Sequence, residues 1–239
     1  MNYLKLAFAW LADPAHWGGA SGIWARLGQH MATTALVVVL AGLIALPAGI
    51  VIGHTRRGSA VVGAIAGAAR AVPTLGLLTL SALWLGIGAT APLLALVVLA
   101  IPSLLAGAYA GIQAVDPAVT DAARAIGISE FGIVAHVEVP LGAPVIIGGV
   151  RAATLQVVAT ATLVAYVADL GLGRYLFRGL KTRDYGQMVA GAVLVVGLAL
   201  ILEVVLALVQ RLVATHITGL GRAERRHQEG ERQCLENLQ

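Results

Sequence analysis

Few side chains in this sequence could do chemistry. Three charged residues, Arg70, Arg151 and Glu203, interrupt long apolar stretches. A polar run from Asp121 to Pro140, DAARAIGISEFGIVAHVEVP, also carries His136 and Glu138. Because a charge near the centre of a bilayer costs about 3 kcal/mol, we expect Glu203 to neutralise one of the two arginines, Arg70 or Arg151. The favoured interpretation is an ion pair that packs helices and has no role in transport.

Several reaction types are excluded by what the sequence lacks. There is no glycine-rich phosphate loop followed by Lys-Ser/Thr, so the chain is not expected to hydrolyse ATP itself. No nucleophile and base stand in a recognisable pattern, and His136 and Glu138 have no third metal ligand nearby, so both are expected to be interfacial residues, as is His30. The single cysteine, Cys234, excludes a disulfide within the chain. The sequence therefore predicts neither an enzyme nor a metal protein.

The composition indicates that lipid is the solvent for most of this chain. Of its 239 residues, 59% are hydrophobic and 12% are charged, against roughly 25% charged in soluble domains. The mean hydropathy is +0.87 and the formal net charge is +4. The basic residues are scattered over loops and the C-terminal tail, which argues against a nucleic-acid-binding surface. We expect an integral membrane protein.

Apolar stretches long enough to cross a bilayer, which needs about 20 residues, occur five times. They run from Met31 to Gly53, Ser59 to Gly86, Ala89 to Ala114, Val139 to Ala168, and Gly186 to Val209. Prolines in or near them predict kinked helices, which lipid tolerates only where protein or water satisfies the freed carbonyls. Glycine pairs four residues apart, which allow helices to approach closely, occur at Gly49/Gly53, Gly63/Gly67 and Gly107/Gly111. Chance is the better explanation for any one pair.

The distribution of apolar and charged residues predicts three parts in the chain. Residues 1–30 form an N-terminal interfacial segment, in which Trp10, Trp17 and Trp24 recur every seven residues. Pro14 argues against one continuous helix that would align the three indoles. Residues 31–210 form the membrane domain, with a polar loop at 114–138, and residues 211–239 form a charged tail predicted to be disordered.

The polar loop predicts a short helix, a turn and a second helix. Asp116-Pro117 is a helix-start signal, with an acidic cap and proline at the first helical position. Gly127 is expected to end the first helix, and the second continues into an apolar segment at Pro140. The small side chains Ala122 and Ala123 would let this first helix contact a groove on a partner closely.

The spacing within this loop resembles a known family pattern. The spacing is that of the EAA loop, which it resembles, in permease subunits of binding-protein-dependent ABC importers. In this chain it reads Asp-Ala-Ala, three residues, Gly127, nine residues, Val137, one residue and Val139-Pro140. The family has Glu, Ile and Leu where this chain has Asp121, Val137 and Val139. Further stretches, such as RAVPTLGLLTL, GGVRAAT and GLGRYLFRGLKTRDYGQMVAGA, resemble permeases for quaternary-amine osmoprotectants such as glycine betaine, choline and carnitine.

The resemblance implies an all-α integral membrane protein with about five kinked transmembrane helices, a MetI-like type I ABC importer core and a cytoplasmic coupling helix. It assigns the contact with the ATPase to Asp121, Ala122, Ala123, Gly127, Val137, Val139 and Pro140. The implied partners are ABC ATPase subunits, which bind ATP and magnesium, an extracytoplasmic substrate-binding protein, and a second permease chain, identical or related. This chain itself would hold no cofactor.

The same resemblance orients the chain in the cell membrane, with the EAA loop and C-terminus in the cytoplasm and the N-terminus outside. A weak excess of arginine on the loop side agrees with this. In that orientation Arg70 and Arg151 lie about 16 Å, and Glu203 about 10 Å, from the cytoplasmic ends of their spans.

Other functions stay open at this point. A permease for another small solute, such as an amino acid, would share all these features. A secondary transporter or channel would predict paired carboxylates within the spans and an internal repeat, but only Glu203 is present in a span. A membrane-embedded enzyme would need a catalytic or metal set that the sequence lacks.

Overall fold

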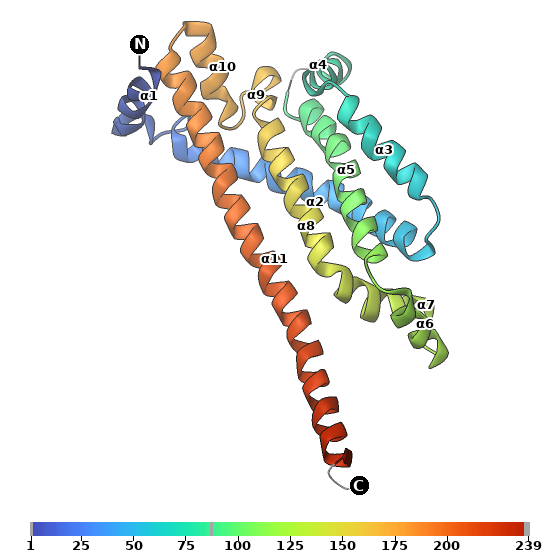
Figure 1. Cartoon of the computed structure of the whole chain (residues 1–239). Helices are drawn as coiled ribbons and strands as arrows, with labels where there is room; N and C mark the ends of the chain where they lie inside the picture. The colour runs from blue at the N-terminus through green and yellow to red at the C-terminus, as the bar shows by residue number, and fades with distance from the viewer. Residues whose placement is uncertain (1, 87, 237–239) are drawn as a thin grey trace.

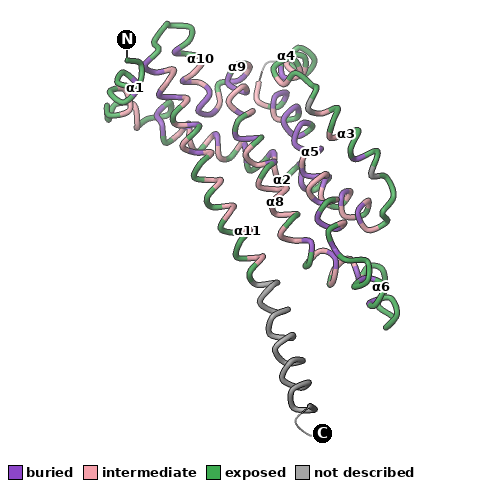
Figure 2. The backbone as a smooth tube through the Cα atoms, viewed as in Figure 1, coloured by how far each residue is buried: buried purple, intermediate pink, exposed green. Residues whose placement is uncertain are grey.

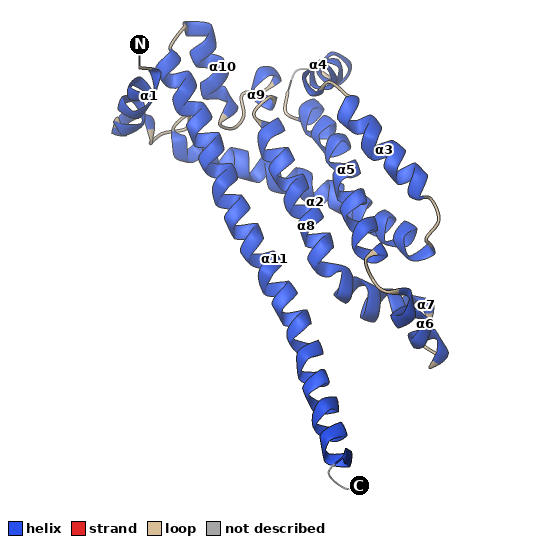
Figure 3. Ribbon diagram, viewed as in Figure 1, coloured by secondary structure: helices blue, strands red, loops and turns tan. Residues whose placement is uncertain are grey.

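The computed structural model describes residues 2–86 and 88–236; the side chains of Ser59, Arg70 and residues 216–236 lie outside the described part. Within that part the chain forms helices joined by short loops, and no strand occurs (Figure 3). In chain order the elements are α1 (Tyr3–Ala12), η1 (Pro14–His16), α2 (Ile23–Thr55), α3 (Ser59–Ala71), α4 (Thr74–Leu85), α5 (Thr90–Gln113), α6 (Pro117–Ala125), α7 (Glu130–Ile133), η2 (Val134–Glu138), α8 (Val139–Ala161), α9 (Val164–Val167), α10 (Gly173–Thr182) and α11 (Tyr185–Glu236).

Four of the described helical stretches are long and apolar enough to cross a membrane: Ile23–Thr55, Thr90–Gln113, Glu130–Val167 and Tyr185–Thr215. A fifth span exists if α3 and α4 count together, although the two are bent by 83°. The bend falls at Val72 and Pro73, where the backbone is extended, because a proline disfavours helical geometry in the residue before it. The predicted all-α membrane fold with about five kinked spans is confirmed.

The bundle has two distinct ends (Figure 1). The N-terminus, α1, α4, α9 and α10 lie at one end, and α6, α7 and the turn between α2 and α3 lie at the other. α2 crosses α5 and α8 diagonally and packs against both. The helices nearest the two ends of the chain, α1 and the C-terminal part of α11, therefore lie at opposite ends of the bundle.

Small residues bring the three central helices together. Residues that Figure 2 colours as buried occur on α2, α5 and α8, and the core cluster between these helices includes Val37, Ala41, Leu104 and Val157. A Cβ atom on Gly149 of α8 would lie 2.5 Å from the Cα atom of Gly107 of α5, so only glycine fits at that crossing. A Cβ atom added to Gly49 would likewise clash with Ala108 of α5.

The predicted glycine pairs therefore differ in role. Gly49/Gly53 and Gly107/Gly111 lie at contacts between helices, where an added Cβ would clash with a neighbour. Gly63 and Gly67 on α3 have nothing within 4 Å of such a Cβ, so their face is open within this chain.

The N-terminal segment folds back on the bundle instead of forming one tryptophan stripe. Pro14 begins a separate 3₁₀ turn, so α1 and α2 are distinct helices. The Trp10 ring stacks on His16 and lies edge-on to Tyr175 of α10, whereas Trp17 contacts Trp24. The three indoles thus serve different contacts, as the sequence signal from Pro14 indicated.

The charged tail continues α11, and its predicted disorder in isolation stays a prediction. The backbone of α11 is helical as far as Glu236 and so includes most of residues 211–239. Arginine, glutamate and leucine are the commonest residues of that stretch, and all three favour the helix. The division of the chain into three parts stays a prediction.

An ion pair joins α8 to α11. Arg151 Nε donates to Glu203 Oε2 at 2.8 Å, and a second contact joins Arg151 Nη2 to Glu203 Oε1. Arg151 Nη1 also donates to the side chain of Gln210 at 3.0 Å, and Gln210 Nε2 donates to the carbonyl of Pro144 at 2.9 Å. Of the two partners considered for Glu203, the structure brings Arg151 to it, while the side chain of Arg70 lies outside the described residues.

We predict that Glu203→Leu lowers the stability of the protein, because it leaves the Arg151 charge without its partner inside a span. The double variant Arg151→Leu/Glu203→Leu should recover most of that loss, since both charges are then absent. Thermal unfolding of the purified protein in detergent measures both. A single variant as stable as the wild type would contradict the pairing role.

We also predict that Gly149→Ala destabilises the protein by about 1–3 kcal/mol, the usual cost of overpacking, because the new methyl group meets backbone on α5. The matched control is Gly197→Ala on α11, where nothing lies within 4 Å of the added Cβ. The control should be neutral or slightly more stable in the same unfolding assay. Equal effects of the two changes would show that the α5–α8 contact is not tight.

Candidate functional site

The coupling segment (residues 114–138) begins as the sequence predicted. Asp116 caps α6, since its Oδ1 accepts a hydrogen bond from the backbone N–H of Ala118 at 2.9 Å, and Pro117 occupies the first helical position. The cap satisfies a backbone donor that the first turn of a helix leaves free. The start of α6 is therefore fixed by local chemistry alone.

Gly127 ends α6 in a left-handed conformation. Its φ is +88°, and the N–H of Ile128 donates to the carbonyl of Ala123 while the N–H of Gly127 donates to that of Arg124. These two bonds form a Schellman motif, in which a left-handed residue closes the helix, and glycine takes that conformation without steric cost. The predicted C-terminal cap is confirmed. It sets the angle between α6 and α7.

Ion pairs connect α6 to α7 across this turn. Arg124 Nη1 lies 2.9 Å from Asp121 Oδ1, and Arg124 Nε lies 2.7 Å from Glu130 Oε1. The hydrogen bond with Glu130 raises the pKa of the Arg124 guanidinium above its ordinary value, so this group stays charged. Asp121 therefore acts on α7 through Arg124.

The outer surface of the coupling segment is apolar. Ile126 is 79% exposed and Phe131 is 82% exposed, and Val119 and Ile128 are exposed beside them. Of the two alanines of the EAA-like pattern, Ala122 is exposed and Ala123 is buried. Large side chains exposed together at the end of a bundle mark an interaction surface. We call Val119, Ile126, Ile128 and Phe131 the apolar patch.

A π-helical turn, η2, joins the coupling segment to α8. The N–H of Val139 donates to the carbonyl of Val134, five residues earlier, and Pro140 follows. A proline cannot donate to the residue four positions before it, and its ring pushes that carbonyl away, which favours a wider turn. Val137 and Val139 are half-buried on either side of this junction, and Pro140 is exposed.

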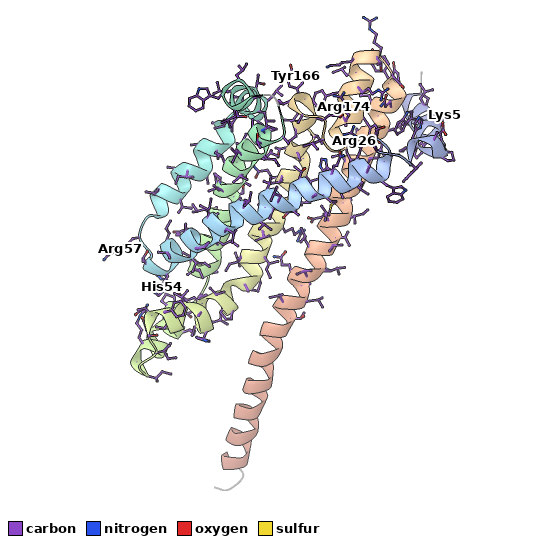
Figure 4. The ribbon with its side chains drawn as sticks, turned by 180° about the vertical axis from the view of Figure 1, so that it is seen from behind. Lys5, Arg26, His54, Arg57, Tyr166 and Arg174 are labelled. Atoms are coloured by element: carbon purple, nitrogen blue, oxygen red, sulfur yellow. The ribbon has the colours of Figure 1, made fainter. Side chains whose placement is uncertain are left out.

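Sequence reasoning missed a histidine that contacts this junction from another helix. His54, in the last turn of α2, lies beside the coupling segment (Figure 4). Its Nδ1 is 2.7 Å from Glu138 Oε2 and its Nε2 is 3.1 Å from Glu130 Oε2. Since 84 residues separate His54 from Glu138, no local pattern points to this contact.

Two interfacial assignments are therefore corrected. The side chain of Glu138 is only 3% exposed and faces His54, whereas His136 is exposed and bonds to the carbonyl of Gly132. His30 is buried, with Nε2 3.0 Å from the carbonyl of Val158 and Nδ1 accepting from the N–H of Leu172. Burial among backbone groups of α8 and the α9–α10 loop removes His30 from the membrane surface, and the contact with His54 of α2 removes Glu138 from it.

The opposite end of the bundle has its own charged contact. The buried Arg26 of α2 donates to the carbonyl of Asp169 at 2.7 Å and pairs with its carboxylate at 2.9 Å, and Arg174 of α10 pairs with the same carboxylate at 3.0 Å. The aromatic residues at this end form separate pairs, among them Tyr166 with Phe177 and Tyr3 with Tyr185. Tyr166 and Phe177 line one pocket at this end, and Tyr3 and Tyr185 line another.

Among the described residues, no group of three or more His, Cys, Asp or Glu side chains could hold a metal ion. The chemistry that the coupling segment can supply is therefore contact: an apolar patch, a fixed turn and a set of ion pairs. These features fit the binding of another protein at one end of a membrane bundle.

Comparison with known proteins identifies the same kind of molecule. Residues 43–218 match the family described as "Binding-protein-dependent transport system inner membrane component". The chain is 31% identical over 183 residues to the choline transport system permease protein OpuBB of Bacillus subtilis, with 77% of this chain and 84% of that protein covered. It is 30% identical over 193 residues to the osmoprotectant import permease protein OsmY of Salmonella typhimurium, with 80% and 82% covered.

A solved structure, the MetNI methionine ABC transporter in inward-facing conformations, shares the fold. One of its chains superimposes with a TM-score of 0.69 at 22% sequence identity, with 80% of this chain and 95% of that chain covered. This supports the predicted MetI-like architecture. The family match and the curated relatives confirm the predicted permease family. The chain belongs to the inner membrane components of binding-protein-dependent transport systems, and it is a transport permease subunit.

Proposed function

We propose that this permease imports quaternary-amine osmoprotectants, such as glycine betaine, choline or carnitine, in an ABC importer whose ATPase is a separate subunit. The relatives that carry such substrates in their names support the substrate class: choline for OpuBB, and glycine betaine, carnitine and choline for OpuCB of Bacillus subtilis, which is 30% identical over 186 residues. The permease would provide the pathway, and ATP with magnesium would bind to the partner.

The observation that carries the coupling role is the exposed face of the coupling segment. Ile126 and Phe131 are almost fully exposed, beyond the ends of α5 and α8, while the turn between them is fixed by Gly127. A groove on an ATPase subunit would cover the apolar patch and remove it from water. Movement of that groove would then turn α6 and α7 as one unit, because Arg124 holds the two helices together.

The remaining partners follow from the same arrangement. In this proposal the coupling segment and the C-terminal part of α11 face the cytoplasm, and the N-terminus, α9 and α10 face a substrate-binding protein outside. A second permease chain, identical or related, would complete the pathway. The open face of α3 around Gly63 and Gly67 supports such a contact, because small residues allow helices from two chains to approach.

The function is tested by reconstituting the complete complex, with its ATPase and substrate-binding protein, into proteoliposomes. We expect ATP-dependent uptake of at least one labelled amine among glycine betaine, choline and carnitine. Methionine serves as the competing substrate class. Uptake of methionine without uptake of any quaternary amine would contradict the proposed substrate, and uptake driven by an ion gradient without ATP would contradict the ABC mechanism.

The coupling role is tested at Gly127. We predict that Gly127→Val abolishes uptake while the protein still inserts into the membrane, because a β-branched residue at φ +88° costs about 1–2 kcal/mol and changes the turn. Gly127→Asn is the matched control, since asparagine tolerates the left-handed conformation, and it should keep most of the uptake. Similarly, Asp121→Lys should lose uptake and Asp121→Glu should retain it. Normal uptake by Gly127→Val and Asp121→Lys would exclude the coupling role.

A further inference from the structure

His54 lies between two carboxylates, one buried and one exposed. Glu138 Oε2 is 2.7 Å from its Nδ1, and Glu130 Oε2 is 3.1 Å from its Nε2. The side chain of Glu138 is 3% exposed and that of Glu130 is 58% exposed. Both ring nitrogens of one imidazole thus face an acceptor on a different part of the coupling segment.

The number of hydrogens on the ring decides whether both contacts hold. An ionised carboxylate can only accept hydrogen bonds, and a neutral imidazole carries a single N–H. Only the doubly protonated ring donates to Glu138 and Glu130 together. When the ring loses one proton, a nitrogen lone pair faces a carboxylate oxygen, and that contact becomes repulsive.

The two carboxylates differ in what else supports them. Glu130 also pairs with Arg124 at 2.7 Å, so it keeps a cationic partner without His54. Glu138 has His54 as its only ion-pair partner within the described part of the chain. A buried carboxylate without a donor is costly, so the single N–H of a neutral ring belongs on Nδ1, where it faces Glu138, and the contact that is lost is the one between Nε2 and Glu130. Arg56, two residues further on, donates to the carbonyl of Val115, and His136 bonds to Gly132.

These contacts form one path between the membrane bundle and the coupling segment. It runs from α2 through His54 to Glu138 at the π turn, and through Glu130 to Arg124 and Asp121 on α6. We propose that His54 is a positioning residue that attaches the coupling segment to α2 in its doubly protonated form, so that coupling between ATP hydrolysis and transport weakens when the ring is neutral. This inference rests on the proposed function and adds a pH dependence to it.

The test measures ATP hydrolysis and amine uptake side by side in the reconstituted complex, over roughly pH 5 to 9, where histidine side chains change charge. For the wild type, the uptake per ATP hydrolysed should fall several-fold as the pH rises through this range. His54→Gln, which has no titrating group and donates from one nitrogen only, should show a low ratio at every pH. His54→Arg, which stays charged and donates to both carboxylates, should keep a high ratio that does not change with pH.

His136→Gln is the matched control, because His136 lies on the same segment but is exposed and touches neither carboxylate. It should retain the wild-type pH profile. A flat wild-type ratio, or a His54→Gln profile equal to that of the wild type, would overturn the inference. If His54→Gln does not assemble with the ATPase, the pH dependence of the wild-type ratio of uptake to ATP hydrolysis still tests the inference.

The two proposals fail in different ways. If the wild type transports no quaternary amine at any pH, the proposed function is wrong. If it transports the amine with a ratio that does not respond to pH or to His54, the proposed function stands and the role of His54 is wrong.

Discussion

Lipid supplies no hydrogen bonds to a backbone, and the rest of this structure depends on that constraint. Almost every described residue between Ile23 and Thr215 is therefore in a helix, and the helices break only at particular places. At Pro73 the break turns a span sharply. Near the junction of α8 and α9, the ring of His30 supplies a donor to the carbonyl of Val158. Irregular backbone is thus paired with protein groups rather than left to lipid.

The same solvent explains how the helices associate. Lipid tails are as apolar as leucine, so burying apolar surface contributes little, and close packing and polar contacts between helices contribute more. The crossing of α5 and α8 at Gly107 and Gly149 supplies the first kind of contact. The Arg151–Glu203 pair between α8 and α11 supplies the second. Close packing of small residues and polar contacts between helices therefore both contribute to the stability of the bundle.

The sequence predicted the features that depend on neighbouring residues. The apolar spans, the cap at Asp116 and the turn at Gly127 follow from composition and local geometry, and the structure has each of them. Contacts between distant residues could not be predicted in the same way. Depth within the membrane left both Arg70 and Arg151 as possible partners of Glu203. His30 and Glu138 were wrongly expected at the membrane surface, because the helices that bury them lie far away in sequence. The pattern of apolar residues in one sequence predicts the helices, but it does not predict which helices cross.

The π turn before Pro140 has a consequence for how α8 could move. A π turn encloses one residue more than an α turn, and one residue corresponds to about 100° of rotation around a helix axis. If that turn tightened to ordinary helical geometry, α8 would rotate about its own axis relative to α7. Such a twist would carry the glycine face of α8 away from α5. The extra residue thus lies at the junction between the coupling segment and α8, where it allows a change in the rotational setting of the helix.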